Sequence, residues 1–328
     1  MENKQATTMK TRDLRNVIVL DGGFSTQLAK YVGPDIIDKD PLWSARYNAT
    51  RPQDVMQVHL DYLKAGADII STNTYQASIE GYMQYLGLTR QESLDLINST
   101  VNLAFEARDI FQKDNNDKKP LVMGSVGPYG AHLHDGSEYN GSYAKTISEE
   151  ELKAWHRPRI NALIEAGVDG LAIETIPCQL EAEALINLIV EEFPGTTAWM
   201  SFQCKDDSSL ASGDNFREAA LSCWKLAAPT NCLLAIGANC IHPKYVAGLF
   251  ASLKQSQTFQ IPLIVYPNSS EQYIPDEGRW QKRDQCTPLE KYVSMWTDLG
   301  VKFIGGCCRT DDEYIRNTRK ILNDLISK

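Results

Sequence analysis

Eight short apolar runs, separated by longer segments of helical character, constrain the fold of this chain more than any other feature. The runs are Val17–Leu20, Asp68–Ser71, Leu121–Gly124, Gly170–Glu174, Thr197–Phe202, Leu233–Gly237, Pro262–Tyr266 and Lys302–Gly305. Near-continuous apolar runs are typical of strands that are buried on both faces, as the strands of a parallel sheet are. The pattern therefore predicts parallel strands joined by helical crossovers.

The segments between the runs carry the signals that begin and end helices. Gly66, Gly167 and Gly300 each stand shortly before the next run, where a glycine ends a helix in the left-handed conformation. The segment Ser148–Glu151 has the serine and glutamate spacing of a capping box, and Pro158 predicts a kink or break in the helix that follows. Eight helix–glycine–strand units in 328 residues predict a single-domain (β/α)8 TIM barrel, with a doubly wound open sheet as the alternative.

The composition narrows the class of partner. A net charge of −9 argues against binding to nucleic acid, which normally requires a basic face. The sequence contains no run of 18 apolar residues, so we expect no membrane span. Residues 1–12 are polar and lack the apolar stretch of a secretory signal. We therefore expect a flexible tail over 1–12, a barrel domain over 13–328, and a cytoplasmic protein that is a monomer or weak oligomer.

Reactive cysteines stand where two of the predicted strands end, on the rim where barrel enzymes build their sites. Cys240 follows the sixth run, and Cys307 and Cys308 follow the eighth. Three thiolates suit the tetrahedral preference of zinc and leave a fourth position for a substrate thiol. Neighbouring residues of a strand point to opposite faces, so both Cys307 and Cys308 reach one ion only if the chain leaves strand geometry, which Gly305–Gly306 permits. The alternative is three unrelated buried thiols.

Two carboxylates, Asp21 and Glu174, stand at the ends of the first and fourth runs. Carboxylates on an inner rim are costly unless a cation neutralises them, and the ammonium group of an amino-acid substrate would do so. Gly22 and Gly23 offer backbone N–H groups to the carboxylate of such a substrate. The alternative is that the two acids pair with arginines, for which the candidates are Arg46, Arg157 and Arg159.

From Asp21-Gly22-Gly23 to Cys307-Cys308, the chain resembles the homocysteine S-methyltransferases. The most specific part of the resemblance is the pairing of Gly237–Cys240 with Gly305–Cys308. The resemblance implies that Cys240, Cys307 and Cys308 hold a catalytic zinc ion, and that Asp21 and Glu174 lie at the amino group of homocysteine. Asn73, from the polar group that ends the second run, joins the expected substrate-binding residues.

The segment Ser125–Gly130, followed by Asp135–Tyr139, resembles the branch of this family that uses S-methylmethionine or S-adenosylmethionine. The resemblance implies methyl transfer from such a sulfonium donor to the thiol of homocysteine, giving methionine. The nucleophile would be the zinc-bound thiolate of the substrate, and no protein nucleophile is expected. Trp43, Tyr129 and Glu138, in the loops after the first and third runs, are the expected donor-binding residues, because aromatic faces attract a methylated cation.

Several alternatives stay open. Betaine could be the donor, and other acceptors such as selenocysteine could replace homocysteine. A non-catalytic zinc or redox-sensing protein would hold the metal in a closed site, for which Cys204 is the available fourth ligand. The tyrosines of the loop after the third run could serve only to pack that loop onto the rim.

Overall fold

The structure is a computed structural model, and it describes residues 17–33, 37, 39–254, 261–274, 279–281 and 287–327. The expected tail over residues 1–12 lies outside these residues, as does part of the segment between β7 and α12. Within the described chain, all eight predicted strands are present at or within a few residues of their expected positions.

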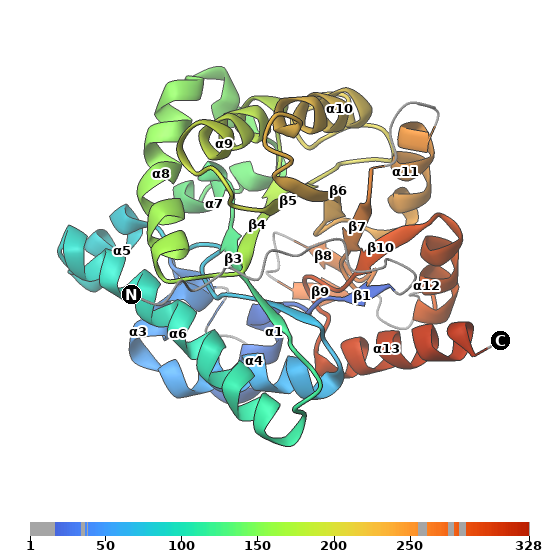
Figure 1. The fold of residues 1–328 in the computed structure, drawn as a ribbon. Coiled ribbons are helices and arrows are strands. Elements are labelled where there is room, and N and C mark those ends of the chain that lie inside the picture. Colours follow the sequence, from blue (N-terminus) through green and yellow to red (C-terminus); the bar gives the residue numbers. More distant parts are fainter. Residues whose placement is uncertain are drawn as a thin grey trace.

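Eight parallel strands form one sheet in the order β1-β10-β7-β6-β5-β4-β3-β2. A parallel bridge between Leu20 and Ile69 joins its two edge strands, so the sheet closes into a barrel surrounded by helices (Figure 1). This closure confirms the predicted TIM barrel and excludes the open sheet. A two-stranded hairpin follows β7. The strands are β1 Ile18–Val19, β2 Ile69–Ser71, β3 Leu121–Val126, β4 Gly170–Ile176, β5 Ala198–Phe202, β6 Leu233–Asn239, β7 Leu263–Tyr266, β8 Gln272–Ile274, β9 Arg279–Gln281 and β10 Val301–Ile304.

The helices lie outside the barrel, and most of them connect successive strands (Figure 1). Among the described helices, none has both the length and the apolar character needed to cross a bilayer. The α-helices are α1 Phe24–Val32, α3 Arg46–Thr50, α4 Pro52–Ala65, α5 Ile79–Leu86, α6 Arg90–Asp114, α7 Tyr129–Leu133, α8 Glu149–Glu165, α9 Gln179–Glu192, α10 Phe216–Ala227, α11 Val246–Lys254, α12 Leu289–Asp298 and α13 Asp312–Ile326. Short 3-10 helices are η1 Trp43–Ala45, η2 Ser137–Tyr139, η3 Ser142–Lys145 and η4 Pro243–Tyr245.

The helix signals read from the sequence are largely confirmed. Gly66 ends α4 in the left-handed conformation, with a φ of 106°, and Ser148–Glu151 forms the predicted capping box of α8. The break expected at Pro158 does not occur, because α8 continues through it to Glu165. Leu152 before the proline and Leu163 after it are both buried in apolar clusters, so packing on both sides holds the helix together despite the lost hydrogen bond.

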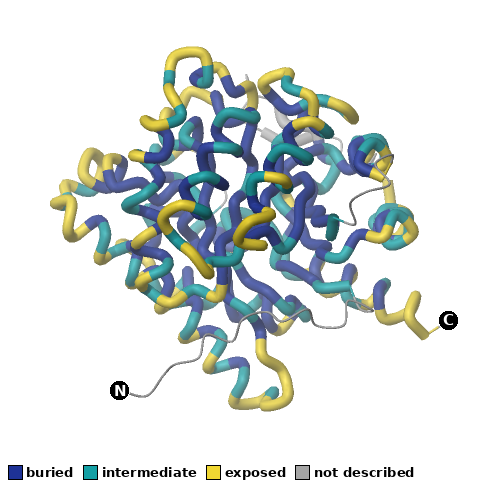
Figure 2. The backbone as a smooth tube through the Cα atoms, turned by 45° about the horizontal axis from the view of Figure 1, so that its top comes forward, coloured by how far each residue is buried: buried dark blue, intermediate teal, exposed yellow. Residues whose placement is uncertain are grey.

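The strands have one apolar layer on their outer face and another on their inner face. The buried backbone of the strands lies at the centre of the molecule (Figure 2). The larger layer packs the outer faces of the strands against the helices. Alternate residues of the strands point the other way and fill the barrel interior. The interior side chains are Leu20, Ile69, Met123, Ala172, Trp199, Ala235, Ile264, Tyr266 and Phe303. Because side chains fill the interior, a ligand site has to lie at the carboxyl ends of the strands.

A candidate metal and substrate site at the barrel mouth

Cys240 directly follows the last residue of β6, in an unusual backbone conformation. Its φ is 53°, in the left-handed region that few residues other than glycine adopt. Its N–H group donates to the carbonyl of Tyr266 at 3.2 Å, so pairing with the end of β7 continues through this turn. Strained backbone of this kind is concentrated at functional sites.

Cys307 and Cys308 lie beyond the end of β10, in a turn rather than a strand. Strand geometry ends at Ile304, as the zinc prediction required. The hydroxyl of Thr310 donates to the carbonyl of Cys307 at 2.7 Å, and a Cβ atom on Gly306 would lie 2.1 Å from that hydroxyl. A side chain on Gly306 would therefore displace the contact that shapes the cysteine turn.

The three sulfur atoms converge. Cys240 Sγ lies 3.5 Å from Cys308 Sγ, and the sulfurs of Cys240, Cys307 and Cys308 all lie within 4.8 Å of one another. Two sulfurs bound to one tetrahedral zinc ion at about 2.3 Å would be roughly 3.8 Å apart, so the donor set and its spacing fit this metal. Interactions among the three thiols lower the pKa of the Cys240 thiol and raise that of Cys307. Within the described chain, Cys204 does not join this cluster.

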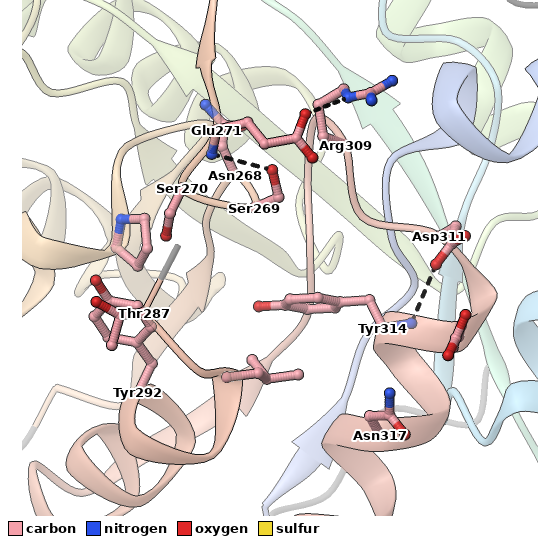
Figure 3. Close-up of a pocket in the computed structure, with 13 residues that line it drawn as sticks. Asn268, Ser269, Ser270, Glu271, Thr287, Tyr292, Arg309, Asp311, Tyr314 and Asn317 are labelled. Carbon is pink, nitrogen blue, oxygen red and sulfur yellow. Dashed lines mark hydrogen bonds and ion pairs between the residues drawn. The ribbon is translucent and has the colours of Figure 1, made fainter. Parts of the chain in front are cut away.

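The turn that follows Cys308 is braced from its other side. The guanidinium group of Arg309 donates to Glu271 at 2.9 Å, and the N–H group of Ser269 donates to the carbonyl of Cys308 at 3.2 Å. A cavity of about 280 Å³ lies here between the segment after β7, α12 and α13 (Figure 3). Its described lining includes none of the three cysteines, so this cavity is separate from the sulfur cluster.

The carboxylates of Asp21 and Glu174 lie at the same mouth. Asp21 Oδ2 accepts the N–H group of Ser71 at 2.6 Å, and Glu174 accepts the hydroxyl groups of Ser125 and Tyr266. Burial raises the pKa of Glu174 to about 7. Burial also raises the pKa of Asp21 well above its usual range, and the charge of Glu174 adds to this effect. Two acids that repel each other in a desolvated site favour a cationic ligand.

The alternative partners of these acids bond elsewhere. Arg46 pairs with Asp40, and Arg157 pairs with Glu192. Arg159 donates to backbone carbonyls beyond the end of β3 and in the loop after β2. None of the three predicted arginine pairings is therefore realised in the described contacts.

A buried asparagine links the second acid to the cysteines. Asn239 is fully buried, accepts the N–H group of Thr175 at 2.8 Å and donates to its hydroxyl at 2.8 Å. Thr175 has a φ of 61°, and β4 shifts register against β5 between Ile173 and Ile176. Asn239 thus holds β4 in an irregular conformation just after Glu174, while its own chain neighbour is Cys240.

The segment between β3 and α8, residues 127–148, is here named the β3–α8 loop. Within it, Glu138 is only 7% exposed, and no described group bonds its Oε2 atom. Burial raises the pKa of Glu138 to about 7, and the negative charge of Cys240 contributes to the increase. The hydroxyl of Tyr139 contributes to lowering the pKa of the Cys240 thiol. The tip of the β3–α8 loop therefore lies at the sulfur cluster and presents an unsatisfied buried carboxylate.

Residues 18–322 match the model of the family described as Homocysteine S-methyltransferase. The chain belongs to this family. It is accordingly a methyltransferase. It is 47% identical over 321 residues to the Betaine-homocysteine S-methyltransferase of Drosophila melanogaster, covering 95% of this chain and 96% of the relative. It is 42% identical over 321 residues to Homocysteine S-methyltransferase 3 of Arabidopsis thaliana, and the match covers 93% of this chain and 90% of the relative. The metallated homocysteine methyltransferase MmuM of Escherichia coli shares its fold, with a TM-score of 0.80 and 36% identity. This match covers 93% of this chain and 96% of the relative.

Gly23 has a bonding partner within the protein, and its expected contact with substrate stays a prediction. Its N–H group donates to the carbonyl of Thr310 at 2.8 Å, so the predicted donor to a substrate carboxylate is used within the protein. A Cβ atom on Gly23 would lie 2.3 Å from the carbonyl oxygen of Cys307. The glycine is required because the strand end packs directly on the cysteine turn. The expected contact of Gly22 with substrate stays a prediction.

Asn73 is likewise occupied within the protein. Its amide donates to the carbonyl of Ser44 at 2.8 Å and to the side chain of Asn48 at 2.7 Å, and its oxygen accepts the hydroxyl of Ser44 at 2.7 Å. Both donors of the amide are therefore used, and Asn73 ties the end of β2 to η1 and α3. Direct binding of substrate by Asn73 would require one of these bonds to break.

Two of the three expected donor-binding residues contact other parts of the structure. Trp43 is half-buried against the helical core layer, with a φ of 47°. Tyr129 packs edge-on against Tyr143 and Trp155, at ring-centroid distances of 5.5 and 5.1 Å. Tyr129 and Tyr143 thus pack the loop onto the barrel, as the alternative reading of the tyrosines supposed. A direct donor contact by Trp43 or Tyr129 stays a prediction.

The partners that orient the site were not predictable from the sequence. Ser125 and Tyr266 hold Glu174, and Asn239 holds Thr175. All of them belong to the polar groups at strand ends, which was the available signal. No spacing within the sequence indicated which of these side chains would meet.

Proposed function

We propose that this protein transfers a methyl group from a sulfonium donor, S-methylmethionine or S-adenosylmethionine, to the thiol of homocysteine, at a site that would hold zinc. The observation that carries the proposal is the cluster of three cysteine sulfurs, together with the acidic side chains of Glu138 and Glu174, whose pKa values are influenced by Cys240. Three protein ligands leave one tetrahedral position for the acceptor thiol, whereas a structural site would be closed by a fourth. The existence of a metallated form of the E. coli relative supports metal binding by this protein.

Cys240, Cys307 and Cys308 would hold the zinc ion. Bound zinc would lower the pKa of the homocysteine thiol so that it is present as the nucleophilic thiolate. The turn of Cys240, with its positive φ, and the Thr310 contact in the cysteine turn keep the sulfurs together. The protein therefore supplies an arranged set of ligands rather than a nucleophile of its own.

Asp21 and Glu174 would bind the ammonium group of homocysteine. Each acid is desolvated, and a cation between them would favour the ionised form of both. Ser125 and Tyr266 fix the carboxylate of Glu174, and Asn239 fixes the backbone after it. The amino end of the acceptor is thereby held at a set distance from the sulfur cluster, which orients its thiol.

The transfer itself is a single displacement. The acceptor thiol loses its proton to solvent on binding, and its sulfur attacks the donor methyl carbon in line with the donor carbon–sulfur bond. A new carbon–sulfur bond forms as the old one breaks, and the electron pair of the old bond goes to the donor sulfur. The sulfonium becomes a neutral thioether, so no general acid is required. With S-methylmethionine, both products are methionine.

The charges around the mouth favour a sulfonium over betaine. Glu138 has a raised pKa because of its burial, with contributions from Cys240 and Asp135, which are also anionic when ionised. S-methylmethionine carries a sulfonium, an ammonium and a carboxylate, and is a net cation, whereas betaine has no net charge. A second cationic group would give the unpartnered oxygen of Glu138 a partner.

The test is a donor panel on purified, zinc-loaded protein. S-methylmethionine, S-adenosylmethionine and betaine are compared at equal concentration with homocysteine, and methionine formation is measured. The expected result is faster turnover with a sulfonium. Glu138→Gln should raise the KM of the sulfonium donor, whereas Glu106→Gln, an exposed residue of α6, should not.

Faster turnover with betaine would overturn the donor assignment and leave the acceptor site standing. No methyl transfer from any donor, with zinc bound, would favour the non-catalytic alternative. An unchanged sulfonium KM in Glu138→Gln would remove Glu138 from the donor site.

A further inference from the structure

We propose that Glu181, on α9 and away from the sulfur cluster, is a positioning residue that fixes the β3–α8 loop for donor binding. This inference rests on the proposed function. Glu181 is fully buried, yet it is a carboxylate, and its described hydrogen-bond partners include both ends of that loop. Buried acids require a specific reason to be retained, because burial of a charge is costly.

Three hydrogen bonds to Glu181 connect separate elements. One carboxylate oxygen accepts the N–H group of Tyr129 at 2.6 Å and bonds Nε2 of His156 at 2.8 Å. The other oxygen accepts the hydroxyl of Tyr143. Tyr129 begins the loop's first helix, Tyr143 lies in its last 3-10 helix, and His156 belongs to α8. One side chain therefore ties both ends of the loop to α8 and α9, next to which α7 lies (Figure 1).

A second buried charge completes the arrangement. Arg159, 3% exposed, bonds Nδ1 of His156 at 2.9 Å and donates to the carbonyl of Gly127 at 2.7 Å. An arginine only donates and a carboxylate only accepts, so His156 is neutral, with its proton on Nε2. Burial accordingly lowers the pKa of His156 to about 4. The hydrogen-bonded series Arg159–His156–Glu181 binds the backbone at two points, the carbonyl of Gly127 and the N–H group of Tyr129. These two points lie on either side of Pro128.

This anchor is coupled to the tip of the loop by direct packing. A Cβ atom on Gly130 would lie 2.6 Å from the backbone nitrogen of Glu138 and 2.7 Å from the ring of Tyr143. The backbone of Glu138 thus rests on the first turn of α7, and the ring bonded to Glu181 lies beside it. A shift of the anchored ends would move Glu138 and Tyr139, the two residues that face Cys240.

The alternative is that the network contributes only to the stability of the fold. The two readings differ in what they predict for the donor. A purely structural network, once weakened, would lower stability without selective loss of donor binding. A positioning network acts on the loop that carries Glu138, so donor binding should suffer while the cysteines and Glu174, on other strands, retain zinc and homocysteine.

The experiment compares the zinc-loaded wild type with Tyr143→Phe and Glu181→Gln. Tyr143→Phe keeps the ring and all charges but removes one bond to Glu181. Glu181→Gln keeps the shape of the side chain but replaces one accepting oxygen by an NH2 group that donates, and it leaves Arg159 as an unneutralised buried cation. Tyr85→Phe, on the exposed side of α5, is the matched control. The measurements are zinc content, the KM of homocysteine, the KM of the sulfonium donor, and hydrogen–deuterium exchange of peptides from the β3–α8 loop and from β6.

The expected result for Tyr143→Phe is faster exchange in the loop, unchanged exchange in β6, and a donor KM raised roughly tenfold, as loss of one bond to a charged group implies. Zinc content and homocysteine KM should stay at the wild-type values. Unchanged loop exchange in both variants would overturn the proposal, even for a protein that proved inactive. Faster loop exchange with an unchanged donor KM would also overturn it. Absence of methyl transfer by the wild type would instead refute the proposed function.

Discussion

Replacing Glu174 by glutamine should make the metal-free protein more stable. The same change should weaken the binding of homocysteine to the zinc-loaded enzyme. Burial raises the pKa of Glu174 from its ordinary value of 4.5 to about 7. As pH rises from 4.5 to 7, the unfolded chain gives up this proton before the folded protein does, so stability is lost across that interval. A difference of ~2.5 pKa units at ~1.4 kcal/mol each makes the loss ~3.5 kcal/mol above pH 7. Glutamine has no such proton to lose.

The magnitude can be converted into a melting temperature. An unfolding entropy of roughly 2.1 cal/mol/K per residue gives ~0.7 kcal/mol/K for 328 residues. Glu174→Gln should therefore melt ~5 °C above the wild type at pH 8, and the difference should vanish near pH 4. Circular dichroism of both proteins, with chelator and reductant present, measures this. In the zinc-loaded protein, calorimetric titration should show homocysteine affinity reduced by a factor of roughly 30 or more, as for loss of a buried charged partner.

The matched control is Glu106→Gln, which removes an exposed carboxylate from α6 and should change neither quantity. A variant that melts at the wild-type temperature at pH 8 would refute the desolvation argument. A variant with wild-type affinity for homocysteine would refute the role of Glu174 in binding. The two outcomes are independent, because the first concerns the protein without ligands and the second concerns the complex.

Three further predictions follow from the described contacts. Cys308→Ala should lose zinc and activity together, whereas Cys232→Ala, a buried cysteine outside the cluster, should keep both; full zinc content in Cys308→Ala would contradict the three-ligand site. Burial lowers the pKa of His59 to about 3, so the contribution of His59 to stability should fall by ~2 kcal/mol between neutral pH and pH 5, and the difference in urea unfolding between the wild type and His59→Leu should change by that amount. Peroxide should release zinc and inactivate the enzyme, because Cys240 and Cys308 sulfurs lie 3.5 Å apart, and bound homocysteine should slow this; equal rates would argue against an open fourth position.

The barrel and the position of its candidate metal site were predictable from the sequence for one physical reason. Parallel strands buried on both faces read as apolar runs, and the reactive residues of a barrel follow directly after such runs. Cys240 and Cys307 could thus be placed at the ends of the two strands that flank β7 without knowledge of their contacts. The glycines before Cys307 also indicated that the chain leaves strand geometry, and the turn after Ile304 confirms this.

The functions of individual polar groups were less predictable, because they depend on partners far away in the sequence. The N–H group of Gly23 could donate to a substrate or to another part of the protein. Its partner in the structure, Thr310, lies 287 residues away in the sequence. The bond from Tyr129 to Glu181 spans 52 residues, and the bond from Thr175 to Asn239 spans 64. No local period encodes such pairs, since each belongs to the packing of two or more βα units.

The groups around the mouth have a common electrostatic property that connects stability with function. Asp21, Glu174 and Glu138 all have raised pKa values because they are buried, and the three cysteines become anionic when they bind a metal. Such a site is costly in the ligand-free protein, and each cation that enters it, whether metal, ammonium or sulfonium, relieves part of that cost. The binding preference for cations therefore arises from the same desolvation that destabilises the empty mouth. This is why stabilising the free protein at these positions is expected to impair its function.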